Sequence, residues 1–170
     1  MANLFLTADT HFGHAGMCQF LNADGSKVRP WDNVEEMDEA LVEQWNKTVG
    51  PKDKVYHLGD VVINRKALST LDRLNGDLVL IKGNHDIFKL SDYTKYFRDI
   101  RAYHILDRIC FSHIPQHPDS IARFRGNVHG HLHAGQVMLD GQIDTRYKCV
   151  CVEQTNYAPI AWEQVRTFFN

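Results

Sequence analysis

The stretch LVLIKGNHD, residues 78–86, decides how this chain of 170 residues folds. Its first four residues are a continuous apolar run, which is typical of a parallel β-strand covered on both faces. Gly83 then permits a tight turn, and the turn presents an amide, an imidazole and a carboxylate on Asn84, His85 and Asp86. Open α/β sheets bind ligands at the carboxyl ends of their strands. The stretch therefore predicts a ligand site at the edge of a parallel sheet.

Two strands and two helices are predicted before this stretch. Residues 34–49 show the clearest helical pattern, with a polar N-cap at Asn33 and apolar side chains every three or four residues. Residues 64–74 form a second predicted helix, and residues 3–8 and 54–58 are the predicted strands. The β-α-β-α-β order predicts a parallel sheet with right-handed crossovers. The polar residues after each strand should then meet at one edge.

The pattern changes in the second half of the chain, where short apolar or alternating runs replace helical spacing. Asp140-Gly141 is a strong signal for a two-residue hairpin turn. These runs predict a second sheet, packed on the first within one domain that spans residues 1–170. The predicted elements of this half are a short helix near 91–97, strands at 101–106, 108–112, 127–131, 136–139, 142–145 and 148–152, and a closing helix at 161–169.

The composition is that of an ordinary globular protein, with 44% hydrophobic and 24% charged residues. The formal net charge is -2 and no basic stripe is evident, so we expect no extended nucleic-acid surface. We find no cationic leader and no apolar stretch long enough to cross a membrane. The four cysteines form no C-x-x-C pair. We therefore expect a cytoplasmic protein with reduced thiols.

Eight of the ten histidines gather in or beside five short polar blocks. Asp9 and His11 are separated by one residue, so on an extended strand end both would face the same side. His131 and His133 repeat that relation. Asp60 follows the second strand and offers two carboxylate oxygens, enough to bridge two cations. The blocks are D-T-H at 9–11, G-D at 59–60, G-N-H-D at 83–86, S-H at 112–113 and G-H-L-H at 130–133.

These side chains suit two mixed nitrogen and oxygen shells for divalent ions. Such shells favour Zn, Mn, Fe or Ni over Ca or Mg. Two divalent cations (+4), two aspartates (−2) and a bridging hydroxide (−1) leave about +1, which would attract a phosphate anion that the hydroxide can attack. His85 is not needed to fill a shell. It is predicted to protonate the departing oxygen or to stabilise charge on the phosphoryl group, with Asp86 holding its other ring nitrogen.

The blocks together resemble the signature of the calcineurin-like metallophosphoesterases. The small members that lack a cap domain, some of them phage-encoded, also resemble this chain in the stretches D-T-H-F-G-H and E-M-D-E-x-L-x-x-x-W-N. The resemblance implies a four-layer α/β/β/α sandwich with its metals at one edge, and His85 as the catalytic histidine. It further implies that the first metal takes Asp9, His11, Asp60 and His133, and that the second takes Asp60, Asn84, His113 and His131.

The expected function is a dinuclear metal-dependent phosphoesterase that acts by direct attack of a metal-bridging hydroxide. A site without a cap is open at one edge, which favours phosphodiesters over monoesters. The substrate is expected to be a small phosphoester, nucleotide-derived in one version of the hypothesis. Mn is the favoured metal, with Fe, Zn or Ni as alternatives. The competing functions are a phosphomonoesterase or nucleotidase, a nuclease, and a metal-binding scaffold with little catalysis.

Several polar residues outside the blocks are also candidates. His14 could contact the substrate phosphate or a water beside the metals, or simply satisfy the loop. Arg29, in the triplet Arg29-Pro30-Trp31, could meet phosphate at the substrate edge. His57 and His129 are expected to be satisfied histidines of the core, and Cys149 and Cys151 to be small buried residues.

Overall fold

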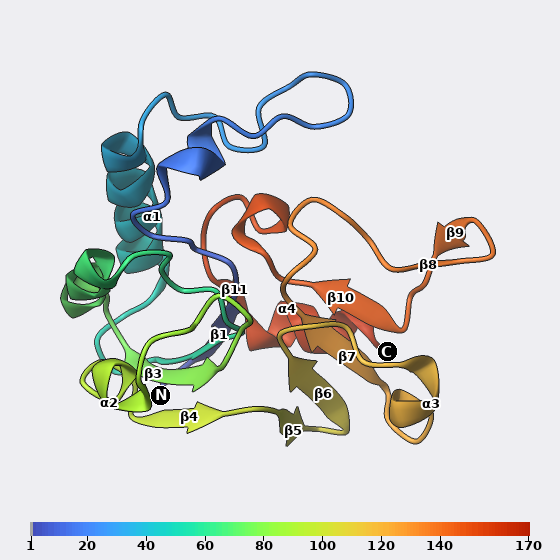
Figure 1. Cartoon of the computed structure of the whole chain (residues 1–170). Coiled ribbons are helices and arrows are strands. Elements are labelled where there is room, and N and C mark those ends of the chain that lie inside the picture. The colour runs from blue at the N-terminus through green and yellow to red at the C-terminus, as the bar shows by residue number, and fades with distance from the viewer. Residues whose placement is uncertain (1) are drawn as a thin grey trace.

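Two mixed β-sheets face each other in the computed structural model, which describes residues 2–170 (Figure 1). The first sheet has the strand order β11-β1-β2-β3-β4. Its four parallel strands are β1 (Leu4–Thr7), β2 (Lys54–His57), β3 (Asp77–Ile81) and β4 (Asp99–Arg101). The last strand of the chain, β11 (Ile160–Ala161), pairs with β1 in the antiparallel direction.

The second sheet has the order β10-β7-β6-β5. The strands β6 (Ile109–Ser112), β7 (Gly126–His129) and β10 (Tyr147–Cys149) are parallel, and β5 (His104–Leu106) is antiparallel to β6. A separate two-stranded ribbon, β8 (Met138–Leu139) and β9 (Gln142–Ile143), projects from the body of the molecule in Figure 1.

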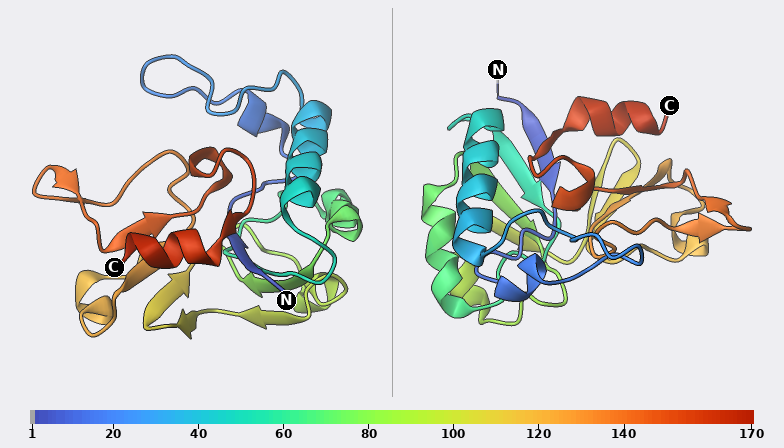
Figure 2. Two further views of the ribbon diagram at one scale, coloured as in Figure 1. Left: turned by 180° about the vertical axis from the view of Figure 1, so that it is seen from behind. Right: turned by 90° about the horizontal axis from the view of Figure 1, so that it is seen from above.

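Helices lie outside the sheets, which confirms the predicted α/β sandwich (Figure 2). The helix α1 (Val34–Thr48), the 3-10 helix η2 (Arg65–Arg73) and the short α2 (Leu90–Tyr93) cover the outer face of the first sheet. The fourth layer is thin, because α3 (Pro118–Ile121) is a single turn against the second sheet. The helix α4 (Trp162–Phe168) packs beside β1 and β11.

The core between the sheets explains the continuous apolar runs of the sequence. Side chains from both sheets and from α4 meet there and exclude water, which is the main source of folding free energy. The two short remaining helices, η1 (Ala15–Cys18) and η3 (Val152–Gln154), contribute buried side chains to the cluster that α1 and η2 form with the first sheet. The buried residues of the central core are Leu6, Ala8, Tyr56, Leu58, Val79, Ile81, Ile109, Phe111, Val128, Cys149, Val150, Cys151, Trp162 and Val165.

The two predicted helices form, but with different windings. In α1 the side chain of Asn33 accepts a hydrogen bond from Glu36 N at 2.9 Å, as the predicted N-cap requires. The second helix is a 3-10 helix rather than an α-helix. Its leucines at positions 68, 71 and 74 recur every three residues, and that spacing matches the three-residue turn of a 3-10 helix.

Two strand predictions are wrong in part. Residues 101–106 were expected to be one strand, but the chain leaves the first sheet at Arg101 and enters the second at His104. No glycine or proline marks this crossing, so the sequence carries no signal for it. Of the predicted strands 136–139 and 142–145, only 138–139 and 142–143 are strands, and they form the separate ribbon instead of joining the second sheet. Its Asp140-Gly141 turn has the predicted positive φ values, 50° and 77°.

The sheets are joined at the edge where the polar blocks lie. A parallel bridge pairs Ala8, just after β1, with Cys151, just after β10. The turns after β1, β2 and β3 therefore meet the turns after β6 and β7. Among the residues that the structure describes, no helix has the length and apolar character to cross a membrane.

Candidate metal centre

Five of the seven predicted metal ligands have a left-handed backbone. Their φ values lie between 50° and 68°, a region that costs non-glycine residues roughly 1–2 kcal/mol each. The expectation that extended strand ends align the paired ligands is therefore wrong. Strain of this kind persists where the surrounding structure enforces it, and it gathers at functional sites. The five residues are Asp9, His11, Asp60, His131 and His133.

Backbone hydrogen bonds between the blocks hold these conformations. Asp9 N donates to Gly59 O at 2.9 Å, and His11 N donates to Asp60 O at 3.1 Å. His131 N donates to the Asp9 carboxylate, at 2.8 Å from Oδ2. The blocks thus fix one another's backbone, and this cross-bonding turns the side chains inward.

The first group of candidate ligands comprises Asp9, His11 and His133. Asp9 Oδ1 lies 3.7 Å from Nε2 of each of the two histidines. Asp9 Oδ1 and both ring nitrogens of His11 are buried, and they have no hydrogen-bond partner in the described part of the chain. Burying such atoms unpaired is costly. A cation between the three side chains would satisfy Asp9 Oδ1 and His11 Nε2 together.

The second group comprises Asp60, His113 and His131, with Asn84 beside them. His113 Nε2 is 3.4 Å from Asp60 Oδ2 and 2.8 Å from Asn84 Oδ1. Asn84 Oδ1 also lies 3.0 Å from His131 Nδ1. The other ring nitrogen of His113 is 2.7 Å from the Leu58 carbonyl oxygen and donates to it, which leaves Nε2 free to offer a lone pair. The group can therefore hold a cation.

Asp60 connects the two groups. Its Oδ2 lies 3.7 Å from His11 Nε2 and 3.4 Å from His113 Nε2. Its other oxygen, Oδ1, accepts a hydrogen bond from His85 N at 2.8 Å, which fixes the carboxylate. All seven predicted ligands are thus gathered into two adjoining groups, as the sequence predicted, with one aspartate between them.

The surroundings of both aspartates favour the ionised form. Burial alone would raise the pKa of Asp9, but the neighbouring imidazoles of His11, His113 and His133 outweigh it and hold the pKa below its usual range. Burial also opposes ionisation of Asp60, and the neighbouring His113 lowers that pKa below its ordinary value. Two buried carboxylates and their imidazole neighbours form a donor set suited to divalent transition metals.

Two glycines make room for the aspartates. A Cβ at Gly83 would lie 2.3 Å from Asp60 Oδ1 and 2.5 Å from Asp60 N. A Cβ at Gly130 would lie 2.4 Å from Asp9 Oδ2 and 2.8 Å from Ala8 Cβ. The glycine that opens each of these two blocks therefore packs against an aspartate of another block.

The side chains of His85 and Asp86 lie in different surroundings in the structure. The His85 side chain is exposed, with its ring centroid 5.7 Å from that of His11. Asp86 is fully buried and accepts hydrogen bonds from the backbone N–H groups of Asp60, Val61 and Gly83, at 2.9, 3.0 and 2.8 Å. The prediction that Asp86 holds the His85 ring is wrong, because its carboxylate supports the turn that carries Asp60.

Arg29 does not lie at a substrate edge, so that prediction is also wrong. Its side chain has no exposed surface, and it donates to the backbone oxygens of Asp9 and Thr10 at 2.5 and 2.7 Å. It also pairs with the buried Glu153. His14, by contrast, lies at the site, half-buried and with its ring centroid 5.5 Å from that of His11.

The residues expected to be structural are buried. The pKa of His57 falls to about 3 because burial disfavours its charged form. Its Nδ1 accepts from Gly59 N at 3.2 Å, and its Nε2 donates to Thr10 Oγ1 at 3.0 Å. His129 is buried with Nδ1 2.7 Å from Gly130 O, and Cys149 and Cys151 are also buried.

The sequence did not identify two neighbours of the first group. Cys151 Sγ lies 3.2 Å from Asp9 Oδ2, and Glu153 Oε1 lies 3.0 Å from His133 Nδ1. A signal for Glu153 was present, since it is a carboxylate that directly follows the apolar run at 149–152.

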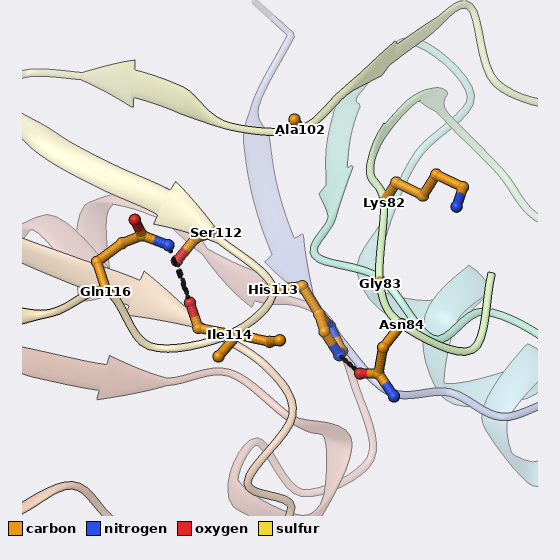
Figure 3. Close-up of a pocket in the computed structure, with 8 residues that line it drawn as sticks. All are labelled: Lys82, Gly83, Asn84, Ala102, Ser112, His113, Ile114 and Gln116. Carbon is orange, nitrogen blue, oxygen red and sulfur yellow. Dashed lines mark hydrogen bonds between the residues drawn. The ribbon is translucent and has the colours of Figure 1, made fainter. Parts of the chain in front are cut away.

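A pocket of about 310 Å³ opens beside the second group (Figure 3). Asn84 and His113 belong to both, and in Figure 3 their side chains meet at one end of the pocket. The facing wall comes from the loop after β6, with Ile114 and Gln116. Lys82 lines the opposite side, and its side chain extends away from that loop in this view. The pocket therefore adjoins one candidate ligand group rather than both.

The fold and the site define a class: an α/β sandwich with two candidate metal-ligand groups at one edge of its sheets. No known family model matches the chain. The chain is 33% identical over 175 residues to the uncharacterized protein MJ1445 of Methanocaldococcus jannaschii, in an alignment that covers 97% of this chain and 90% of the relative. The chain belongs to the same family as MJ1445.

The fold has a close counterpart among solved structures. The protein of unknown function AQ665 from Aquifex aeolicus aligns with a TM-score of 0.73 and 24% identity, over 98% of this chain and 99% of that one. The two proteins share this fold. A structure described as a novel archaeal phosphodiesterase shows only weak similarity, with a TM-score of 0.47 and 14% identity over 88% of this chain and 82% of that one. That likeness carries no functional argument.

Proposed function

We propose that this protein is a dinuclear metal-dependent phosphoesterase. The observation that carries the proposal is the place of Asp60 Oδ2, 3.7 Å from His11 Nε2 and 3.4 Å from His113 Nε2. One carboxylate shared by two ligand groups suits two metals held close together, as in phosphoester hydrolases. Bound metals would supply a hydroxide nucleophile and stabilise charge on the phosphoryl oxygens. Manganese is the proposed metal, and a small phosphoester in the cytoplasm is the proposed substrate.

The chain's own residues divide the remaining work. In this proposal the first metal is held by Asp9, His11, Asp60 and His133, and the second by Asp60, Asn84, His113 and His131. His85 stands at the exposed rim beside His11, where its ring can give a proton to the leaving oxygen. His14, on another side of His11, contacts the substrate phosphate.

The pocket favours a diester over a monoester. It lies beside Asn84 and His113, whereas the ring of His85 neighbours His11 at the other group. A diester carries two organic groups, so one could face His85 and leave while the other occupies the pocket. The pocket wall is fixed, because the buried side chain of Asn127 accepts from Gln116 N at 2.8 Å. The exposed Ile114 adds an apolar surface for an organic group.

The test compares turnover of bis(p-nitrophenyl) phosphate with that of p-nitrophenyl phosphate. The protein is stripped of metal and reloaded with Mn, Ni, Zn or Fe. We expect turnover of both esters, with the diester preferred, and a loss of that preference in Gln116→Ala. No turnover of either ester with two metals bound would reject the enzyme and favour a metal-binding scaffold. Asp60→Ala, which removes the shared ligand, should bind fewer ions than any variant of an unshared one.

A further inference from the structure

A buried ion pair between Arg29 and Glu153 contacts both chain segments that carry the first ligand group, residues 9–11 and 131–133. The side chains of Arg29 and Glu153 are 0% and 3% exposed. Arg29 Nε and an Arg29 terminal nitrogen each lie 2.9 Å from Glu153 Oε1. The partners are 124 residues apart in the chain. A charged pair removed from water is costly unless its geometry and further hydrogen bonds compensate, so its placement calls for an explanation.

Each partner of the pair reaches toward the first group. Glu153 Oε1 lies 3.0 Å from His133 Nδ1 and accepts a hydrogen bond from it. Arg29 donates to Asp9 O at 2.5 Å and to Thr10 O at 2.7 Å. Glu153 therefore orients the proposed ligand His133, and Arg29 holds the backbone of the proposed ligand Asp9 by a hydrogen bond.

The contact with Glu153 decides which nitrogen of His133 faces the metal position. Because Nδ1–H donates to Glu153, Nε2 carries the lone pair, and it is Nε2 that lies 3.7 Å from Asp9 Oδ1. A carboxylate on the far nitrogen of a ligand histidine fixes the ring and raises its basicity. The His133 side chain is 30% exposed, so neighbouring packing alone does not immobilise it.

The second group has a weaker support. There the far nitrogen of His113 donates to a neutral backbone carbonyl, Leu58 O at 2.7 Å. Asn84 brings no charge, and its side chain is exposed. In the first group a carboxylate is thus hydrogen-bonded to the far nitrogen of His133, whereas the corresponding partner of His113 in the second group is a neutral carbonyl.

We infer that Glu153 is a positioning residue for His133 and that, together with Arg29, it makes the first metal position the tighter of the two. The inference rests on the proposed dinuclear centre. Replacing a group that supports a metal ligand typically lowers metal affinity 10–100-fold. The loss in Glu153 variants falls on the first position, and the second keeps its affinity.

The test titrates Mn²⁺ into chelator-stripped protein by calorimetry, with two binding events expected in the wild type. Glu153→Gln should weaken the tighter event roughly 10–100-fold and leave the weaker one unchanged. Asp144→Asn is the matched control, because it breaks another arginine–carboxylate pair, with Arg146, at a carboxylate that is 5% exposed. If Glu153→Gln does not fold, Glu153→Asp keeps the charge on a shorter side chain and should weaken the same event less.

A double variant separates positioning from general support of the fold. In a His133→Ala background, Glu153→Gln should no longer change Mn²⁺ affinity, because the ring through which it acts is gone. A loss that persists in that background, or an equal loss in Asp144→Asn, overturns the inference. Two Mn²⁺ events that Glu153→Gln leaves unchanged also overturn it and spare the proposed function. A wild-type protein that binds no metal ion overturns both.

Discussion

Asp86 holds the backbone of Asp60: its Oδ2 accepts a hydrogen bond from Asp60 N at 2.9 Å. The same carboxylate also accepts from Val61 N and Gly83 N, at 3.0 and 2.8 Å. Asp86, the last residue of the G-N-H-D block, therefore joins that block to the G-D block by hydrogen bonds. Asn84 and His85 face the site, and Asp86 turns back to support the residue shared by the two ligand groups.

Replacing Asp86 should affect folding before chemistry. In Asp86→Ala three buried N–H groups lose their acceptor, and we expect the free energy of unfolding to fall by at least about 3 kcal/mol. Urea denaturation of the metal-free protein measures this. Asp119→Ala is the control, because that carboxylate is 93% exposed. Equal stabilities of the two variants would contradict the assigned role.

His85→Asn should separate metal binding from turnover. The ring is exposed and the ligand groups do not include it, so both metals should remain bound. Loss of a general acid should lower the rate about 10²–10⁴-fold. Metal content by mass spectrometry and the rate with an aryl diester are measured side by side, with the exposed His117→Asn as control. Unchanged turnover would remove His85 from the mechanism.

Gly83→Ala should disturb the proposed metal centre although it replaces none of the proposed ligands. The added Cβ would meet Asp60 Oδ1 at 2.3 Å and Asp60 N at 2.5 Å, so the shared carboxylate has to move. We expect bound metal to fall below two ions per chain. In Gly50→Ala the nearest contact would be a side-chain oxygen at 3.3 Å, and this control should keep both ions. Full metal content in Gly83→Ala would show that Asp60 can shift at no cost.

Acid should weaken the fold through His57. Its pKa is about 3 in the folded protein against an ordinary 6.5, so between these values the unfolded chain takes up a proton that the native state refuses. The contribution of His57 to the free energy of unfolding is fully present above pH 6.5. It falls by about 1.4 kcal/mol for each pH unit below that value. Denaturation at pH 7, 6 and 5 should show a shallower decline in His57→Gln. Parallel declines in the two proteins would contradict this source of acid sensitivity.

Periodicity was enough to predict the parallel strands and α1, because their apolar spacing is set by burial on one or both faces. The order of the blocks after the strands was enough to predict that seven candidate ligand residues meet at one edge. It could not reveal the left-handed backbone at His131 and His133. Two histidines separated by one residue have the same sequence pattern in an extended and in a left-handed backbone. Nor could the order of the blocks assign partners across long separations, as for Arg29 and Glu153. Such pairings depend on how the two sheets meet.

The bridge between Ala8 and Cys151 has a consequence for the order of events during synthesis. The strand β1 is synthesised long before its neighbour β11, and neither candidate ligand group is complete until His131 and His133 have emerged. A nascent chain that ends before these residues carries several candidate ligands, but neither group is complete. In the proposed dinuclear centre, a metal ion would therefore find all of its ligands only after the two halves of the chain have met.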